Sequence, residues 1–474
     1  MAELLEPDIC VIGAGSGGLS VAAAAAQFGV DVVLIEKGKM GGDCLNYGCV
    51  PSKAMIAAAK SAQRMREAGK FGIARANPRV DPAGVHDHVH GVIAAIAPMD
   101  SVERFTGLGV RVIEEAGRFI DRETVEAGGY HVKARRFVVA TGSSPGVPPI
   151  PGLDKVPYFT NETIFDNKKA LEHLMVIGGG PIGMEMAQAH RRLGAKVTVL
   201  EAFTPLGKDD PELTAIVLKQ LESESIDIRA GIRIERLEKS RTGVRAVITE
   251  EGKERNLEAD QLLVAAGRQP NVEGLGLEAA GIEYERRGIK VTRGLKTTNR
   301  RVYAIGDVAG GLQFTHVANY HAGIVIRNAL FRLPVKVDTS IIPWVTYTEP
   351  ELAHVGMTEE QAREKHKDIR VMRWPYEEND RAQTERATQG LIKVVTTKRG
   401  RILGATIAGE HAGELIQLWV MAMSKKMKIG AITSIVFAYP TLSEISKRAA
   451  YQYYAPSLTN PTIRRIIGWL RKLG

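Results

Sequence analysis

The pattern of apolar and polar positions along the chain repeats itself. One copy reads VIGAGSGGLSVAAAAAQFGVDVVLIEKG from Val11, and the other reads VIGGGPIGMEMAQAHRRLGAKVTVLEAF from Val176. In each copy a short apolar run leads into a glycine-rich turn, and a helix-like stretch ended by Gly29 or Gly194 leads into a second apolar run. Short apolar runs bounded by glycines predict buried strands. The chain is therefore predicted to contain two strand–turn–helix–strand units of an α/β protein.

Both turns have the form G-x-G-x-x-G, which is typical of dinucleotide-binding loops. Their glycines are Gly13, Gly15 and Gly18 in the first copy, and Gly178, Gly180 and Gly183 in the second. The first glycine permits a tight turn, the second lets a pyrophosphate approach, and the third lets helix and strand pack closely. The helix N-terminus offers N–H groups to the phosphates. Two complete copies favour two dinucleotide sites over the alternative of two glycine-tolerant turns.

An acidic residue ends the second strand of each copy, 23 residues after the first glycine of its turn. These residues, Glu36 and Glu201, are placed to accept hydrogen bonds from ribose hydroxyls. A carboxylate repels a 2′-phosphate, so Glu201 predicts that the second site prefers NAD(H) to NADP(H). Arg191 and Arg192 lie on the predicted helix and not at the strand end, and they weaken this prediction only slightly.

The chain has three cysteines, Cys10, Cys44 and Cys49. Residues i and i+5 of a regular helix lie about 7.5 Å apart along its axis, whereas a disulfide needs Cα atoms roughly 4.4 to 6.8 Å apart. We therefore expect Cys44 in an irregular turn and Cys49 near the start of an alanine-rich helix, where a thiol pKa is lowered. The alternative is a pair of buried structural cysteines. No further Cys or His lies nearby in the sequence, so a metal site at this pair is not expected.

The segment GGDCLNYGCVPSK around these cysteines resembles the redox-active motif of the class I pyridine-nucleotide:disulfide oxidoreductases. That family includes dihydrolipoamide dehydrogenase, glutathione reductase and mercuric reductase. Three other segments, ATGSSP from Ala140, TTNRRVYAIGDVAGG from Thr297 and IPWVTYTEPELAHVG from Ile342, resemble further motifs of the family in the same order. The resemblance implies FAD at the first repeat, with Asp307 binding its ribityl chain. The other cofactor-binding positions that it implies are Lys53, Thr141, Gly142, Gly267 and Gly306.

The resemblance also implies the organisation of the chain. The expected fold class is α/β, with two Rossmann-like dinucleotide-binding domains, for FAD and NAD(P), and a C-terminal α+β dimerisation domain. The FAD-binding domain would comprise residues 1–150 and 276–342, the NAD(P)-binding domain residues 151–275, and the dimerisation domain residues 343–474. The Pro-rich segment 145–152 and the segment 265–271 would be the crossovers. A homodimer is expected.

In the mechanism that the resemblance implies, NADH reduces the flavin, and the flavin opens a disulfide between Cys44 and Cys49. Cys49 would be the thiolate on the flavin side, and Cys44 the thiol that exchanges with the substrate. Lys53 would lie by the flavin ring and pair with Glu185. An ordinary surface helix residue is the alternative for Glu185.

The C-terminal segment FAYPTLSEISKRA, from Phe437, departs from the pattern of the disulfide reductases. Glu444 fits that pattern, but Tyr439 stands where those enzymes carry the histidine that serves as base. A phenol is a poor proton acceptor at neutral pH. Mercuric reductases also carry Tyr there, although the chain has neither the C-terminal Cys-Cys pair nor the N-terminal metal-binding domain of such enzymes.

Three hypotheses follow for the function. The first is mercuric-reductase-like reduction of a metal ion, a quinone or an unusual disulfide. The second is a dihydrolipoamide dehydrogenase of a multienzyme complex. The third, from another class, is a flavoprotein scaffold that binds a partner. The joint presence of Cys44, Cys49, Lys53 and Glu185 argues against the third.

Composition and charge add few constraints. The formal net charge is +9, but Lys and Arg are scattered except near the C-terminus, so nucleic-acid binding is not expected. The sequence contains no run of 18 apolar residues, so no transmembrane segment is expected. The acidic N-terminus does not resemble a secretory signal. A cytoplasmic protein is therefore expected. His86, His88 and His90 lie on a predicted helix, where His86 and His90 share a face. We expect an ordinary helix there and no metal, because no acidic ligand is evident in the sequence.

Overall fold

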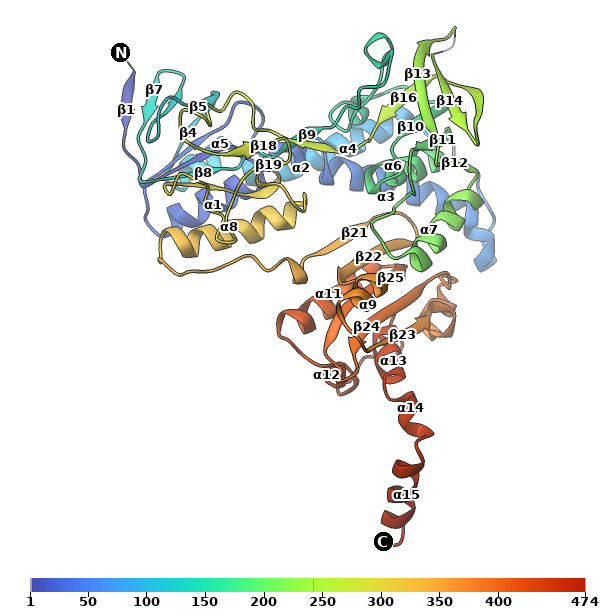
Figure 1. Cartoon of the computed structure of the whole chain (residues 1–474). Coiled ribbons are helices and arrows are strands. Elements are labelled where there is room, and N and C mark those ends of the chain that lie inside the picture. The colour runs from blue at the N-terminus through green and yellow to red at the C-terminus, as the bar shows by residue number, and fades with distance from the viewer. Residues whose placement is uncertain (1, 242, 474) are drawn as a thin grey trace. The chain divides into compact units, whose positions relative to one another are not determined.

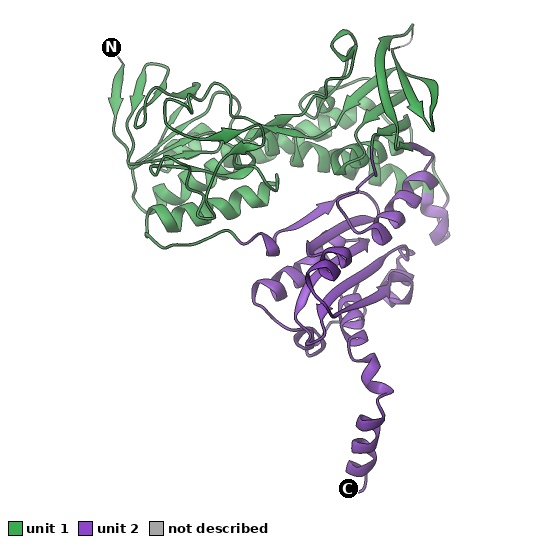
Figure 2. Ribbon diagram, in the orientation of Figure 1, with its two compact units in different colours: residues 1–66, 75–202, 229–337 green, residues 67–74, 203–228, 338–474 purple. Residues whose placement is uncertain are grey.

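The computed structural model describes residues 2–241 and 243–473, which form two compact units (Figures 1 and 2). Both predicted dinucleotide-binding repeats lie in unit 1. Unit 1 comprises residues 1–66, 75–202 and 229–337, and unit 2 comprises residues 67–74, 203–228 and 338–474.

The first repeat forms the centre of a five-stranded sheet in unit 1, and all the strand pairs of this sheet are parallel. Helices α1 (Ser16–Gln27) and α8 (Thr315–Ala329) share an apolar core with one face of it. The sheet order is β20 (Val302–Ala304), β8 (Arg136–Val139), β2 (Ile9–Ile12), β3 (Val32–Ile35) and β4 (Val110–Ile113).

Strand β2 is buried on both faces, which explains its continuous apolar sequence. Ile9 and Val11 pack with the helices, while Cys10 and Ile12 face the opposite core. A small sheet contributes to that second core. Its strands, in sheet order, are β1 (Glu3–Leu5), β7 (Tyr130–Val132), β6 (Val125–Ala127) and β5 (Gly117–Phe119). Cys10 is therefore a packing residue, and burial raises the pKa of its thiol well above the usual range.

The second repeat forms another sheet, in which β10 pairs in parallel with β11 and β16. Helix α6 (Pro181–Arg192) follows β10 as the repeat predicts. The sheet order is β12 (Ile226–Ala230), β11 (Lys196–Glu201), β10 (His173–Ile177) and β16 (Gln261–Val264). An antiparallel sheet shares its core, with strands β13 (Arg233–Lys239), β14 (Val244–Glu250) and β15 (Lys253–Ala259).

The two predicted crossovers between the repeats lie side by side. Strand β9 (Ser143–Pro145) pairs antiparallel with β17 (Arg268–Pro270). Between β3 and β4 the chain forms four α-helices: α2 (Gly42–Asn46), α3 (Cys49–Glu67), α4 (Pro82–Ile96) and α5 (Val102–Gly107). A short hairpin joins β18 (Tyr284–Glu285) and β19 (Gly288–Ile289).

Unit 2 is built on an antiparallel five-stranded sheet. Its order is β21 (Pro343–Thr346), β22 (Glu351–Gly356), β25 (Ile402–Gly409), β24 (Leu391–Thr397) and β23 (Ile369–Pro375). Helices α11 (Ala412–Ser424), α12 (Ile429–Thr433) and α13 (Glu444–Gln452) share its core, in which Trp419 is fully buried. The remaining helices are α7 (Pro211–Ser223), α9 (Glu359–Lys365), α10 (Asp380–Thr384), α14 (Ala455–Leu458) and α15 (Pro461–Leu470).

Candidate active site

The first glycine-rich loop has a separate requirement at each of its three glycines. Gly13 has a φ of +106°, and a Cβ there would lie 2.4 Å from the carbonyl oxygen of Ala140. A Cβ at Gly18 would lie 1.8 Å from the carbonyl oxygen of Gly13. A Cβ at Gly15 would instead point into open space. Protein packing thus accounts for the first and third glycines, whereas Gly15 leaves room where a phosphate would approach.

The second loop repeats this geometry position by position. Gly178 has a φ of +111°, and its Cβ would lie 2.4 Å from the carbonyl oxygen of Ala265. A Cβ at Gly183 would lie 1.9 Å from the carbonyl oxygen of Gly178, and one at Gly180 would again meet open space.

The two strand-end acids also occupy equivalent places. Glu36 accepts hydrogen bonds from the backbone N–H groups of Ala14 at 2.5 Å and Gly38 at 2.7 Å. Glu201 accepts one from the N–H of Gly179 at 2.6 Å. Ala14 and Gly179 are the same position of the G-x-G-x-x-G motif. Each carboxylate therefore lies against its loop, beside the open second glycine.

Thr141 and Gly142 are joined to the second crossover by hydrogen bonds to Asn271. The Thr141 hydroxyl donates to the Asn271 carbonyl at 2.8 Å, and the Asn271 side chain donates back to the Thr141 carbonyl at 2.9 Å. The backbone N–H of Asn271 donates to the Gly142 carbonyl at 3.0 Å. Gly267 adopts a φ of +118°, and its carbonyl accepts from Gly146 at 2.8 Å. These predicted cofactor positions are thus held together by the two paired crossovers.

Asp307 lies in the 3-10 helix Gly306–Ala309 and accepts a hydrogen bond from the Ser143 hydroxyl at 2.6 Å. Arg268 donates from Nε to the same Ser143 oxygen at 2.7 Å. Burial raises the pKa of the Asp307 carboxyl, against the influence of Ser143 and Arg268. Ser143 and Arg268 lie in the ATGSSP segment and in the second crossover, but their contacts with Asp307 were not predicted, because Asp307 is 164 positions from Ser143 in the chain.

The two cysteines lie on two successive short elements. Cys49 is the first residue of α3, as predicted. Cys44 lies within the five-residue helix α2, so the prediction of an irregular turn is wrong. Gly41, with a φ of +86°, is the N-cap residue before α2, and the chain leaves that helix at Tyr47 before α3 begins. The break between the two helices therefore removes the separation that a continuous helix would impose.

Cys44 and Cys49 form no disulfide in this structure, and their thiols differ strongly in pKa. A hydrogen bond from the Cys44 thiol lowers the pKa of Cys49 to about 6, helped by Thr315 and the charge of Lys53 and opposed by burial. The same hydrogen bond to Cys49, together with burial, raises the pKa of Cys44 well above its usual range. Cys49 is therefore the thiolate of the reduced pair at neutral pH.

Thr315 is a contact that the sequence analysis missed. Its hydroxyl lies 3.2 Å from the sulfur of Cys49, and it is the first residue of α8. The two residues are 266 positions apart in the chain. No local signal around Thr315 indicates the contact, because only the fold brings α8 to the start of α3.

Lys53 and Glu185 form an ion pair, with 2.9 Å between Nζ and Oε2. Lys53 lies one turn after Cys49 on α3, and Glu185 lies on α6 of the second repeat. The Glu185 side chain is only 6% exposed, so the alternative of an ordinary surface residue is wrong. Unit 1 thus brings together Cys44, Cys49, Lys53 and Glu185.

Tyr439 and Glu444 belong to unit 2. Glu444 is the first residue of α13, and Tyr439 precedes the cis peptide bond to Pro440. Tyr439 is 70% exposed, and its hydroxyl donates to Asp380 at 3.0 Å. This hydrogen bond raises the pKa of Tyr439, and Glu444 acts in the same direction through its charge. Asp380, which the sequence analysis missed, is therefore the partner of the phenol.

His86 and His90 lie on one face of α4, as predicted, with ring centroids 4.1 Å apart. His88 points elsewhere and contacts the carbonyl of Ala54 at 3.2 Å. The acidic residue that the sequence did not reveal is Asp166, 3.3 Å from Nε2 of His90. One ligand atom from each of His86, His90 and Asp166 lies within 4.8 Å of the others.

Comparison with known proteins agrees with this geometry. The family model of the pyridine nucleotide-disulphide oxidoreductases matches residues 7–322, and the model of their dimerisation domain matches residues 342–450. The chain belongs to this family. A mercuric reductase of Lysinibacillus sphaericus is 36% identical over 94% of this chain and 82% of its own length. A dihydrolipoyl dehydrogenase of Thermus scotoductus is 35% identical over 94% of this chain and 96% of its own length.

A solved structure also matches nearly the whole chain. It is the Cu(II) complex of RclA, an HOCl-induced flavoprotein disulfide reductase from Escherichia coli. It superposes with a TM-score of 0.84 at 28% identity, covering 95% of this chain and 100% of its own. The protein is thus an FAD-dependent pyridine nucleotide-disulphide oxidoreductase, and the predicted fold class and enzyme class are confirmed.

The residues of unit 1 fit the two cofactors of the family, FAD and NAD(P)H. The open space at Gly15 and Gly180 lies beside the carboxylates Glu36 and Glu201, which suits a pyrophosphate next to a ribose. FAD, when bound, supplies the exchange of two electrons between the reduced nicotinamide and the cysteine pair. The chain itself holds Cys49 ionised and keeps a cation, Lys53, close to it.

Proposed function

We propose that this oxidoreductase reduces a metal ion, a quinone or an unusual disulfide through its cysteine pair, in the manner of mercuric reductase. The observation that carries the proposal is Tyr439, an exposed phenol whose pKa is raised by its hydrogen bond to Asp380. It occupies the place of the histidine base of disulfide reductases. A phenol that stays protonated can donate a hydrogen bond, but it does not remove a proton from an incoming thiol.

In this proposal Cys49 is the thiolate on the flavin side, and Cys44 is the thiol that meets the acceptor. The lowered pKa of Cys49, its contact with Thr315 and the nearby charge of Lys53 support this assignment. Oxidation of one reduced nicotinamide yields two electrons. When the cysteine pair returns to a disulfide, these two electrons and its two protons convert a substrate disulfide to two thiols or a quinone to a hydroquinone. With a mercuric ion, the two electrons yield the metal and the two protons are released.

Dihydrolipoamide dehydrogenase is the second candidate. The 35% identity to the Thermus scotoductus enzyme over nearly its full length supports it. Tyr439 opposes it, because oxidation of a dithiol needs a group that accepts a proton.

NADH is proposed as the preferred reductant. Glu201 ends β11 with its carboxylate against the second loop, where a 2′-phosphate would be repelled. Arg192 is buried on α6, and the Arg191 guanidinium contacts the carbonyl of Ala195. A comparison of kcat/KM for NADH and NADPH tests the assignment, and a clear preference for NADPH would overturn it.

We also propose a cytoplasmic homodimer in which Tyr439 and Glu444 complete the partner's site.

Anaerobic titration distinguishes the two candidate functions. The enzyme, reduced by NADH, is mixed in turn with mercuric ion, cupric ion, a quinone and lipoamide, and reoxidation is followed by flavin absorbance. We expect reoxidation by a metal ion or a quinone to exceed that by lipoamide. Turnover of lipoamide and dihydrolipoamide at the rate of a dedicated dehydrogenase would favour the second candidate.

A further inference from the structure

We propose that the C-terminal helix α15 binds the surface of an anionic lipid membrane. The helix and the residues just after it, Pro461–Leu473, follow the matched dimerisation domain, which ends at residue 450. Figure 1 shows α14 and α15 continuing from α13 away from the sheet of unit 2. The family function assigned above does not use this helix.

The apolar side chains of α15 form a single stripe. Ile463, Ile466, Ile467 and Leu470 follow the i, i+3, i+4, i+7 spacing of one helix face. Ile466 and Ile467 are each 51% exposed, and Trp469 at the edge of the stripe is 62% exposed. A stripe of this kind on a globular protein normally faces a core. Here the stripe is exposed to solvent, which indicates that it faces a binding partner.

The charge of the helix identifies that partner. The four charged side chains of residues 461–473 are all basic: Arg464, Arg465, Arg471 and Lys472. By helical spacing Arg465 and Lys472 lie opposite the apolar stripe, and Arg464 and Arg471 lie along its edge, next to Ile467. Basic residues opposite Ile, Leu and Trp characterise helices that lie in the interface of anionic membranes. A second copy of the helix would bring four more positive charges close to these, which disfavours self-association through this segment.

The helix is suited to lying on a bilayer and not to crossing it. None of the helices in the described part of the chain has the length and apolar content that crossing a bilayer requires. Its ten residues, Pro461–Leu470, span about 15 Å, half the thickness of a hydrocarbon core. Asn460 caps the helix by accepting from the N–H of Thr462 at 2.9 Å, and Pro461 occupies its first turn. Its start is therefore encoded locally.

Co-sedimentation of the full flavoprotein with lipid vesicles tests the proposal. We expect binding to vesicles that contain phosphatidylglycerol, weaker binding to pure phosphatidylcholine, and release as salt rises. Ile467→Asp should weaken binding by about tenfold or more, since it places a charge in the buried face. Leu4→Asp is the matched control, because Leu4 is an apolar residue 57% exposed in unit 1. Arg464→Gln with Arg465→Gln should weaken binding to the anionic vesicles and reduce its salt dependence.

Tryptophan fluorescence gives a second readout. On addition of anionic vesicles we expect the emission of Trp469 to shift to shorter wavelength, and Trp469→Phe should abolish the shift. Equal binding by wild type and Ile467→Asp, or no binding by wild type, would overturn the proposal. A chain ending at Thr459 that becomes monomeric would also overturn it, because the helix would then belong to an interface between copies.

An independent observation points to a divalent metal site on α4. The geometry assigns His86, His90 and Asp166 as ligands of one transition-metal ion, since a ligand atom from each lies within 4.8 Å of the others. Two imidazoles and one carboxylate form a ligand set suited to Zn²⁺ or Cu²⁺. Asp87 contacts Nδ1 of His86 at 3.0 Å, and a carboxylate on one ring nitrogen commonly orients a metal-binding histidine.

Titration calorimetry with Zn²⁺ alone tests this site. The protein carries Cys44→Ser and Cys49→Ser, so that the thiols cannot take the metal. We expect one ion per chain, and a loss of affinity of about tenfold or more in His90→Ala, because even the loss of a residue that only orients a ligand typically costs about 10- to 100-fold. His88→Ala is the matched control, because His88 lies on the same helix but faces Ala54. Zinc binding that survives His86→Ala and His90→Ala, or no binding at all, would overturn the assignment.

Discussion

At the scale of the residue, Cys49 shows how much a side chain depends on its neighbours. Its thiol has a pKa of about 6 because Cys44 donates a hydrogen bond to it and because Thr315 and Lys53 stabilise the negative charge. The thiol of Cys10, buried among apolar side chains, has a pKa raised well above the usual range. Cysteines of the same chain therefore differ in chemistry through their surroundings alone.

This difference predicts the pH dependence of the reduced enzyme. Because the pKa of Cys49 is lowered to about 6, the thiolate is present above that pH and is lost as the pH falls through it. We expect the long-wavelength thiolate-to-flavin absorption of the two-electron-reduced enzyme to follow this titration. Cys49→Ser should abolish the band, whereas Cys44→Ser should retain it. The opposite result for the two variants would mean that the roles of the cysteines are exchanged.

Tyr439 predicts a gain of activity by substitution. Tyr439→His should raise dihydrolipoamide oxidation above that of the native enzyme, because imidazole accepts a proton near neutral pH and a phenol does not. General base catalysis contributes about 10²- to 10⁴-fold, so a gain of about tenfold is expected even with imperfect positioning. Tyr439→Phe is the control that removes the hydroxyl without adding a base. Equal activity of the two variants would refute the argument.

At the scale of the element, different glycines of a glycine-rich loop are needed for folding and for cofactor binding. Gly15→Ala adds a methyl group that meets no protein atom within 4 Å, so the chain should still fold. The methyl group would occupy the space where a pyrophosphate approaches, and we expect FAD affinity to fall by about tenfold or more. Flavin retention on dialysis measures this. Gly129→Ala, which also meets nothing within 4 Å, is the control and should retain flavin normally.

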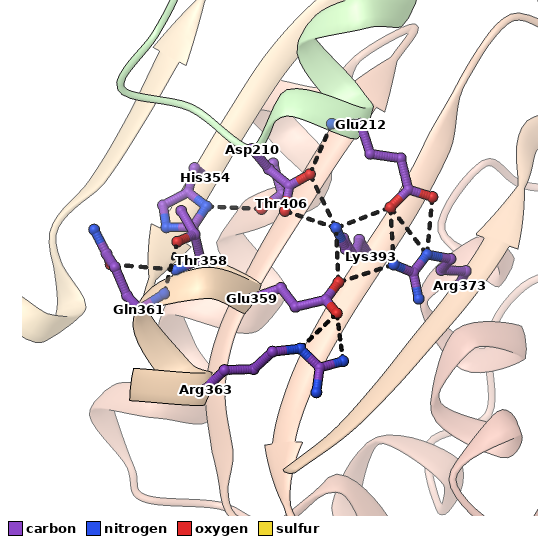
Figure 3. A network of polar contacts seen from close by, with 10 residues as sticks. All are labelled: Asp210, Glu212, His354, Thr358, Glu359, Gln361, Arg363, Arg373, Lys393 and Thr406. Carbon is purple, nitrogen blue, oxygen red and sulfur yellow. Dashed lines mark hydrogen bonds and ion pairs between the residues drawn. The ribbon is translucent and has the colours of Figure 1, made fainter. Parts of the chain in front are cut away.

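A network of charges fixes the start of α7 to the sheet and α9 within unit 2 (Figure 3). Lys393 on β24 is 5% exposed and lies 2.8 Å from Asp210, 2.8 Å from Glu212 and 2.9 Å from Glu359. Arg373 adds contacts to Glu212 and Glu359. Burial alone would raise the pKa of Glu359, but hydrogen bonds from Lys393 and Arg363 lower it to about 2.

Substitution of Lys393 should therefore strongly reduce the stability of the folded protein. Lys393→Met leaves the carboxylate of Asp210, itself 2% exposed, without its cation, and we expect a loss of about 3–5 kcal/mol in the free energy of unfolding. Arg363→Met removes a side chain that is 61% exposed and should cost less than about 1 kcal/mol. Urea unfolding followed by tryptophan fluorescence reports on unit 2, which contains all four tryptophans. Similar losses in the two variants would contradict this account.

The same network predicts a response to acid. The pKa of Glu359 is lowered from its ordinary value of 4.5 to about 2, so its contribution to stability is complete above pH 4.5 and is lost as the pH falls towards 2. The difference in unfolding free energy between wild type and Glu359→Gln should shrink across that window. A difference that stays constant from pH 5 to pH 2.5 would argue against the paired carboxylate.

At the scale of the whole molecule, the matched dimerisation domain predicts a dimer of twice the 51.5 kDa chain mass, measurable by light scattering. If each subunit completes the other's site, a Cys49→Ser chain and a Glu444→Ala chain should both be inactive alone. After mixing and subunit exchange, mixed dimers should regain activity, since each contains one site with both native residues. An active monomer, or no recovery on mixing, would contradict the shared site.

The sequence by itself determined the two dinucleotide-binding loops and the start of helix α3 at Cys49. Their signals are local, because a turn at Gly13 or Gly178 and a helix starting at Cys49 depend on neighbours within a few residues. The Lys53–Glu185 pair was also predicted, but only through the family resemblance, since the two residues are 132 positions apart.

Only the tertiary structure decided the contacts that join distant segments. Thr315 beside Cys49, Asp380 on the Tyr439 hydroxyl and Asp166 beside His90 leave no pattern in the sequence. A hydrogen bond or ion pair needs only a few side-chain atoms at the right distance, and periodicity carries no information about such pairs. The placement of Cys44 depended on the same kind of information, because the break between α2 and α3 arises from backbone geometry that residue spacing alone does not determine.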